Sequence, residues 1–158
     1  MKMTLYLDGD AFPNRIKEIL FRAIKRFSLP TVIVSNKRIN IGTSELLTYI
    51  IVDAGPDVAD ERIVEMVKEG DLVITADIPL ADSVISKKAY AMDHRGNLFN
   101  EDNIASYLSM RNLMQEIRDS GMPTKGPTPF SQKDAHEFAN LLNRFLTEQK
   151  QLRGELEK

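Results

Sequence analysis

The stretch Met3-Thr4-Leu5-Tyr6-Leu7-Asp8-Gly9-Asp10 opens the chain with an apolar run that ends in two carboxylates. The run predicts a buried β-strand over residues 3–8, because continuous apolar segments are typical of strands that are covered on both faces. The Asp-Gly-Asp sequence would then lie at the carboxyl end of this strand, on the edge where open α/β sheets bind ligands. The alternative for either acid alone is a cap on the helix that follows.

Strands and helices alternate along the first 92 residues. Helical spacing of apolar residues predicts helices from Pro13 to Phe27, from Asp57 or Asp60 to Gly70, and from Pro79 to Lys87. Short apolar or β-branched runs predict further strands at residues 31–34, 46–52, 72–75 and 90–92. This alternation predicts an α/β fold of three layers, with a central, mostly parallel sheet and helices on both faces.

Two more helices are predicted after the last of these strands, over residues 100–120 and from Ser131 to about Gln149. A Gly/Pro-rich, irregular segment joins them, so we expect these C-terminal helices to pack on the domain or to form a dimer surface. Ser131 with Asp134 matches a capping box, which favours a helix start over a serine nucleophile. We expect one domain over residues 1–150 and a polar, frayed C-terminal tail over residues 151–158.

Composition limits the classes of function. Of the 158 residues, 42% are hydrophobic and 28% are charged, which are globular values. The formal net charge of −2 gives no overall basic footprint, so phosphate binding would need a local patch or a metal. The absence of cysteine excludes disulfides, zinc–thiolate sites and cysteine nucleophiles. Without a signal-peptide pattern or a long apolar span, we expect a soluble, cytoplasmic protein with no membrane partner.

Two further acidic signals accompany Asp8 and Asp10. Asp57-Val58-Ala59-Asp60 stands at a predicted helix start, and Asp77 closes Thr75-Ala76-Asp77 after a predicted strand. Carboxylates that converge repel one another, so they need a cation or a proton, and hard oxygen ligands favour Mg²⁺, Mn²⁺ or Ca²⁺. The alternatives are an acid in a first helical turn for Asp60 and a helix cap for Asp77.

The other polar residues carry weaker signals. Glu45 has no position that the pattern fixes, and a solvated loop is the expected place for it. The two histidines, His94 and His136, have no partner at the spacing of metal ligands or of a catalytic triad. The basic residues are scattered, but Lys37 and Arg38 follow a predicted strand end on the same edge as the acids.

Several motifs in order resemble those of the bacterial YaiI/YqxD family, which is assigned to the PIN-like nuclease fold. The resemblance runs from Leu5 to about Leu146 and includes Asp8-Gly9-Asp10-Ala11-Phe12-Pro13, Asp57-Val58-Ala59-Asp60, Thr75-Ala76-Asp77-Ile78-Pro79 and Gly126-Pro127-Thr128-Pro129-Phe130-Ser131. It implies that Asp8 is the acid after the first strand, that Asp60 is the acid of the helix before Thr-x-Asp, and that Asp77 is the acid of Thr-x-Asp. Asp10 is an additional acid of this family. The second acid of the general PIN pattern has no clear match, since Glu45 is a poor candidate.

These observations together predict a metal-dependent nuclease that hydrolyses phosphodiesters, in RNA. Asp8, Asp10, Asp60 and Asp77 would hold one or two Mg²⁺ or Mn²⁺ ions. Lys37, Arg38 and Arg111 would contact the backbone of single-stranded RNA without reading its sequence. One alternative is a haloacid-dehalogenase-like phosphatase with Asp8 as nucleophile, Asp10 as general acid and Thr75 as phosphate ligand. The other is a non-enzymatic PIN-like module that binds nucleic acid.

Overall fold

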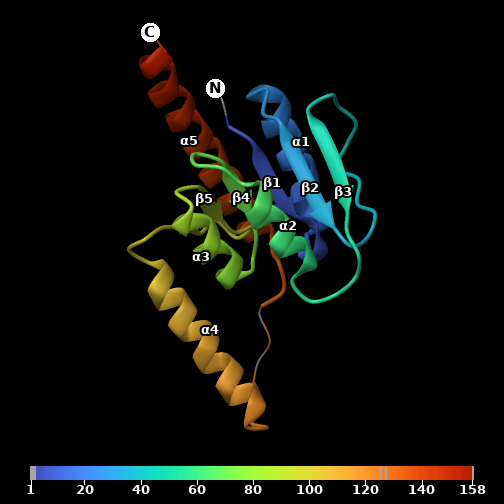
Figure 1. The fold of residues 1–158 in the computed structure, drawn as a ribbon, viewed down its shortest axis with the longest axis vertical. Coiled ribbons are helices and arrows are strands. Elements are labelled where there is room, and N and C mark those ends of the chain that lie inside the picture. Colours follow the sequence, from blue (N-terminus) through green and yellow to red (C-terminus); the bar gives the residue numbers. More distant parts are fainter. Residues whose placement is uncertain (1–2, 125, 127, 158) are drawn as a thin grey trace.

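A six-stranded sheet in the order β3-β2-β1-β4-β5-β6 forms the centre of the molecule (Figure 1). The computed structural model describes residues 3–124, 126 and 128–157. The first five strands are parallel and β6 is antiparallel to β5. The strands are β1 (Leu5–Asp8), β2 (Thr31–Ser35), β3 (Leu47–Ile51), β4 (Leu72–Ile74), β5 (Tyr90–Met92) and β6 (Leu98–Phe99). The mostly parallel sheet expected from the sequence is confirmed, whereas β6 was not expected.

The helices follow the predicted order with changed ends. They are the 3₁₀ turns η1 (Gly9–Ala11) and η2 (Asn14–Ile16), then α1 (Lys17–Arg26), α2 (Val58–Met66), α3 (Ile78–Ser86), α4 (Ile104–Asp119) and α5 (Gln132–Glu157). The helix expected from Pro13 thus begins as a 3₁₀ turn. Within the joining segment that the sequence analysis expected to be irregular, Lys125 and Pro127 lie outside the described residues, as does Lys158 of the expected tail.

The last helix, α5, continues well past its expected end near Gln149 and reaches Glu157. Two contacts of Arg153 show why the helix does not fray there. Its Nε donates to Oε1 of Gln149 at 3.2 Å, and its Nη2 donates to the carbonyl oxygen of Gly70 at 2.6 Å. Most of the segment that was expected to be a frayed tail is therefore helical, and Arg153 fixes it to the turn before β4. The expected domain boundary at residue 150 stays a prediction.

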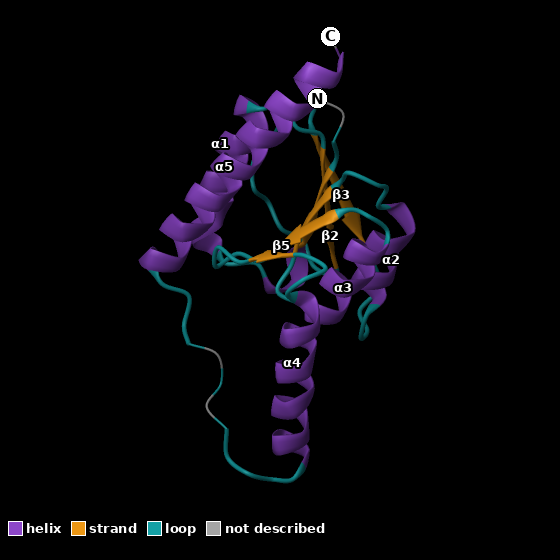
Figure 2. Cartoon of the chain, turned by 90° about the vertical axis from the view of Figure 1, so that its left-hand side faces the viewer, coloured by secondary structure: helices purple, strands orange, loops and turns teal. Residues whose placement is uncertain are grey.

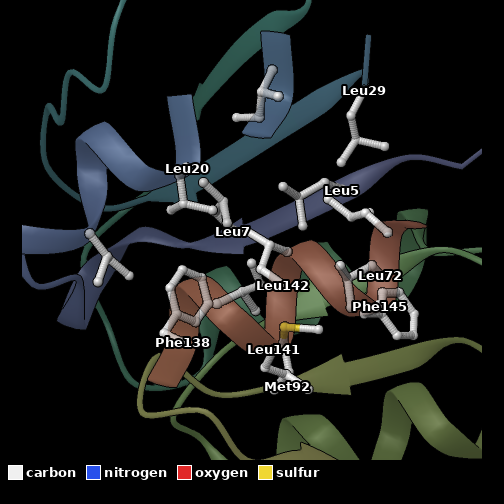
Figure 3. Packing of buried hydrophobic residues seen from close by; sticks show 14 of the residues in the cluster. Leu5, Leu7, Leu20, Leu29, Leu72, Met92, Phe138, Leu141, Leu142 and Phe145 are labelled. Carbon is white, nitrogen blue, oxygen red and sulfur yellow. The ribbon is translucent and has the colours of Figure 1, made fainter. Parts of the chain in front are cut away.

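Helices cover both faces of the sheet, as expected for a three-layer α/β fold and consistent with a PIN-like one (Figure 2). On one face, Leu5 and Leu7 pack against α1 and α5, where Leu20 and Phe138 are fully buried (Figure 3). The neighbouring residues of each strand point the other way, because side chains alternate along a strand. Residues such as Tyr6 and Val73 therefore pack with α2 and α3 on the second face.

The strand order creates a crevice at one edge of the sheet. The chain runs from β1 outward to β2 and β3, and then crosses back to place β4 on the other side of β1. Connections therefore leave β1 and β4 in opposite directions, and open α/β sheets bind ligands at such a switch point, beyond the carboxyl ends of the strands. Asp8 ends β1, and Thr75 and Asp77 follow β4. The fold thus brings two of the three acidic signals to the same place.

The long helix α4 projects away from the rest of the molecule (Figures 1 and 2). Its first turns pack beside α3, where Ile104 is buried and Tyr107 and Leu108 are partly buried. Farther along, the exposed fractions of Met110 and Leu113 are 59% and 49%. Within the part of the chain that the structure describes, no helix is both long and apolar enough to cross a bilayer.

We expect Phe138→Ala to lower the free energy of unfolding by about 3–5 kcal/mol, because it removes a fully buried ring between α5 and the sheet and leaves a cavity. Leu113→Ala on the projecting part of α4 is the control, with an expected change within about 0.5 kcal/mol. Urea unfolding of the two variants measures both values. Equal losses would show that α4 is as firmly packed as α5, against this description.

Candidate metal centre

The carboxylate of Asp8 joins the two strands at the switch point. Its Oδ2 accepts a hydrogen bond of 2.9 Å from the hydroxyl of Thr75, which is 67 residues away in the sequence. Its Oδ1 accepts a longer bond of 3.4 Å from the amide of Asp10. Because β1 and β4 are parallel neighbours, Asp8 and Thr75 come from adjacent strand ends. Asp8 is therefore held in one orientation at the base of the crevice.

Thr75 also fixes the position of Asp77. The amide of Asp77 donates to the Thr75 hydroxyl oxygen at 3.0 Å, and Oδ1 of Asp77 accepts from the amide of Leu80 at 3.0 Å. Asp77 is thus the N-cap of α3, as the alternative reading of the sequence proposed. The cap does not remove Asp77 from the candidate site. It fixes the carboxylate at the edge of the crevice, half-buried and beside α2.

The start of α2 brings two more acids to Asp77. Asp57 occupies the N-cap position of α2 in a left-handed conformation, with φ 64° and ψ 6°, and it makes no side-chain capping bond. Asp60 lies in the first turn of the helix. Asp57, Asp60 and Asp77 can each offer one carboxylate oxygen, and these three oxygens lie within 4.8 Å of one another. Oxygens around Mg²⁺ are at most about 4.2 Å apart, so small side-chain movements would allow this group to hold a metal ion.

Burial and neighbouring carboxylates disfavour the charged forms of two of these acids, Asp60 and Asp8. The pKa of Asp60 is raised to about 8, first by burial, then by a hydrogen bond with Asp77, and then by repulsion from Asp77, Asp8 and Asp57. The pKa of Asp8 is also raised, mainly by burial. Hydrogen bonds from Thr75 and from the amide of Asp10 oppose that shift, whereas the charges of Asp10 and Asp77 add to it. A group of this kind binds a proton or a cation.

A pocket of about 520 Å³ opens above these acids. Asp57, Asp60 and Asp77 line it together with Ser83 of α3. Glu61 and Glu65 of α2 also line it, as does Arg111, the one predicted nucleic-acid contact on α4. The pocket therefore combines a cluster of carboxylates with a guanidinium group, which matches the needs of a metal ion and of a phosphate that binds it.

The other predicted site residues lie elsewhere. Asp10 is exposed, and its Oδ1 accepts a 2.7 Å hydrogen bond from the amide of Asn36 at the end of β2. The structure thus places Asp10 beside Asp8 but does not include it in the three-carboxylate group. Glu45 is exposed in the loop before β3, which is the opposite edge of the sheet from the crevice. Lys37 and Arg38 do lie on the crevice edge, where they line a second pocket.

Asp57 is the residue that the sequence analysis did not select as a metal ligand. It was expected only as a possible helix start, and in the structure its side chain makes no capping bond. The signal that could have identified it is its place after Gly55-Pro56, because a sharp turn there requires an unusual backbone conformation, which Asp tolerates better than most residues. An Asp in that conformation can direct its carboxylate away from the helix.

Ser131 and the two histidines stay outside the site, as expected. The Ser131 hydroxyl accepts from the amide of Asp134 at 3.1 Å, and Asp134 Oδ2 accepts from the amide of Ser131 at 3.0 Å, which confirms the capping box. Arg95 binds the same carboxylate at 2.9 Å. His94 packs against Phe130 with ring centres 5.4 Å apart, and burial lowers the pKa of His94. His136 is exposed on α5.

Comparison with known proteins gives a family but no reaction. The model of the family described as "Uncharacterized BCR, YaiI/YqxD family" matches residues 6–148. The chain is 65% identical to a UPF0178 protein of Sulfurimonas denitrificans over 91% of this chain and 95% of that protein. It is 59% identical to a UPF0178 protein of Sulfurovum sp. over 91% and 97%, and 51% identical to one of Shewanella baltica over 90% and 95%. No solved structure matches the chain.

We expect the metal-free protein to lose stability as the pH rises, because Asp60 binds its proton more tightly in the folded state than in the unfolded one. The stabilisation from this proton is complete below the ordinary pKa of 3.8 and is lost as the pH rises towards about 8. The melting temperature of Asp60→Asn should therefore exceed that of the wild type by a few degrees more at pH 8.5 than at pH 5, since about 1 kcal/mol corresponds to roughly 2–4 °C in a domain of this size.

Thermal melts in EDTA at both pH values measure this difference. The lowered pKa of His94 also makes stability depend on pH, but it does so equally in the wild type and in the variant, so their difference reports Asp60. Glu101→Gln, an exposed acid before α4, is the control and should show no pH-dependent gain. A wild type and an Asp60→Asn variant that keep the same difference in melting temperature at both pH values would contradict the raised pKa.

Proposed function

Since the chain belongs to the YaiI/YqxD family, whose description assigns no reaction, we propose a function from the site itself. The proposal is a hydrolase that uses Mg²⁺ or Mn²⁺ to cleave phosphodiester bonds in single-stranded RNA. The observation that carries it is the convergence of Asp57, Asp60 and Asp77 at the switch point of the sheet, in a pocket that Arg111 also lines. Asp8 lies close enough for its charge to raise the pKa of Asp60, and its hydrogen bond with Thr75 holds it at the end of β1.

The donor set fits a hard divalent cation. All the candidate ligands are carboxylates, the cysteine count is zero, and neither histidine is near the group. Asp60 and Asp77 would hold the ion, with Asp57 or Asp8 completing the protein ligands. When bound, such an ion binds a phosphate oxygen and lowers the pKa of an attacking water. The raised pKa of Asp60 means that the chain exchanges a proton for the cation, so metal binding should be stronger at higher pH.

The cations around the site favour a nucleic-acid backbone as substrate. Arg111 lines the same pocket as the carboxylates, and a guanidinium group can bind a phosphate through two N–H groups. Lys37 and Arg38 extend positive charge along the same sheet edge, beyond β2. Such contacts hold a strand in position and leave its sequence unread. A cytoplasmic location, expected from the sequence, is part of this proposal. So is a homodimer, one of the two arrangements that the sequence leaves open for the C-terminal helices, with Met110 and Leu113 on α4 as exposed apolar residues available to a second copy.

The contacts of Asp10 and Thr75 favour this reading over the phosphatase alternative. A phosphatase of that type needs Asp10 as general acid and the Thr75 hydroxyl on the phosphate. In the structure Asp10 accepts from the amide of Asn36, and the Thr75 hydroxyl lies between Asp8 and the amide of Asp77. A covalent phosphate on Asp8 after incubation with a phosphomonoester would support the phosphatase. RNA binding without cleavage would support the non-enzymatic module.

We expect Asp77→Asn to lower the rate of RNA cleavage about 100-fold or more, equivalent to about 3 kcal/mol, because it weakens the metal site. The fold should survive, since an asparagine oxygen can still cap α3 at the amide of Leu80. Mn²⁺ should raise the melting temperature of the wild type and not that of the variant. Glu45→Gln, on the opposite edge, is the matched control and should behave as the wild type in both assays. Cleavage that resists EDTA would contradict the proposal.

We expect Arg111→Ala to weaken binding of single-stranded RNA about tenfold and to reduce the slope of log affinity against log salt by about 0.7, the value for one lost phosphate contact on a single strand. Arg118→Ala, seven residues later on the same helix, is the control and should leave affinity and slope unchanged. Titrations of a labelled oligonucleotide at several salt concentrations provide both numbers. Equal slopes for the two variants would remove Arg111 from the proposed phosphate contact.

A further inference from the structure

A second pocket of about 510 Å³ lies between the end of β2, the loop that follows it and the last three residues of β3. Its polar lining is basic or neutral and includes Lys37, Arg38, Asn40 and Thr43. Tyr49 and Ile51 of β3 form an exposed apolar wall, with exposed fractions of 39% and 56%. No acid is among the described residues that line this pocket, so its chemistry differs from that of the carboxylate pocket.

The ring of Tyr49 is fixed although much of it is exposed. Its hydroxyl donates to the carbonyl oxygen of Gly42 at 2.8 Å and accepts from the amide of Ile41 at 3.2 Å. Both hydrogen-bonding roles of the hydroxyl are therefore satisfied by one loop. A planar aromatic side chain that is already held in place loses little conformational entropy when a ligand stacks on it.

The loop that holds the hydroxyl is itself fixed to α1. Ile41 is buried in the core. Gly42 has a φ of +143°, and a Cβ atom there would lie 2.4 Å from the ring of Phe21, so only glycine fits this close approach. The amide of Gly42 also donates to Oδ1 of Asn40 at 2.9 Å. The core thus supports the loop, and the loop in turn supports the exposed ring.

We propose that this pocket binds one unpaired nucleobase of the RNA strand, stacked on Tyr49, with Lys37 and Arg38 on the adjacent phosphates. The inference deepens the proposed function and rests on it. A flat aromatic surface beside two cations is the combination that single-stranded nucleic acids need, because bases stack and phosphates require positive charge. Asn40 and Thr43 offer polar groups to the edge of the base.

The position of the pocket relates it to the cleavage site. In the order β3-β2-β1-β4, three strand intervals separate β3 from β4, which is about 14 Å at ~4.8 Å per interval. Tyr49 lies in register with Leu7 and Ile33, on the face of the sheet that α1 covers, whereas Asp60 and Asp77 stand at the starts of α2 and α3 on the other face. An oligonucleotide that places a base on Tyr49 and a phosphate at these acids would therefore cross the carboxyl edge of the sheet between them. A paired base cannot expose its face to Tyr49, so the pocket would make the enzyme selective for single strands.

The test is binding of a fluorescent oligouridine in EDTA, where no cleavage occurs, by fluorescence anisotropy. We expect Tyr49→Ala to weaken binding on the order of 5- to 100-fold, the range found for loss of one stacked base. Tyr49→Phe keeps the ring and should stay much closer to the wild type. Thr48→Ala, an exposed neighbour on the other side of β3, is the matched control and should bind as the wild type does.

An oligonucleotide with abasic positions tests the same contact without changing the protein. The wild type should bind it more weakly than the intact strand, whereas Tyr49→Ala should not distinguish the two. If the wild type binds and cleaves RNA but Tyr49→Ala and the abasic strand change nothing, the base pocket is wrong and the proposed function stands. If purified wild type binds no RNA, both are wrong. Binding through Tyr49 without EDTA-sensitive cleavage would keep the pocket and overturn the nuclease.

Discussion

The parallel pairing of β1 with β4 is the contact on which the rest of the site depends. These strands are distant in the sequence, and the hydrogen bond from Thr75 to Asp8 joins their carboxyl ends across 67 residues. The same threonine accepts from the amide of Asp77, which caps α3, so one hydroxyl sets the positions of two acids. The connection through α2 then brings Asp57 and Asp60 over these strand ends. A loss of this pairing would separate Asp8 from Thr75 and Asp77.

Burial and mutual repulsion make the metal-free site unfavourable in a way that a cation relieves. Burial comes first among the causes that raise the pKa of Asp60 and of Asp8, and the neighbouring carboxylates add to both shifts. The structure retains an additional acid, Asp57, in a left-handed conformation that is costly for a residue other than glycine. The left-handed backbone of Asp57 and the repulsion among the neighbouring carboxylates occur at the same switch point. Their combination favours a ligand-binding role for these acids over a purely structural one.

Much of the fold followed from sequence pattern, because apolar runs and helical spacing report burial directly. The five parallel strands and the order of the helices were predicted, but β6 was not, since a two-residue strand carries no periodic signal. The continuation of α5 to Glu157 depends on Arg153 reaching Gly70, a contact between distant segments that no local pattern shows. The same limit applies to the site. Asp8, Asp60 and Asp77 could be selected as candidate ligands because they stand at the ends of predicted strands and helices. The position of Asp57 depends instead on its left-handed backbone conformation. Asp10 lies outside the three-carboxylate group, and its carboxylate accepts a hydrogen bond from the amide of Asn36.

The most direct test of the central claim is a crystal structure of the protein grown with Mn²⁺, with data collected to reveal the anomalous scattering of manganese. We expect a peak bound by carboxylate oxygens of Asp60 and Asp77, with Asp57 or Asp8 as a further ligand, in the pocket that Arg111 also lines. A structure in which Mn²⁺ is absent from this group, while the three carboxylates keep their positions, would contradict the claim that the switch point of this sheet is a metal centre.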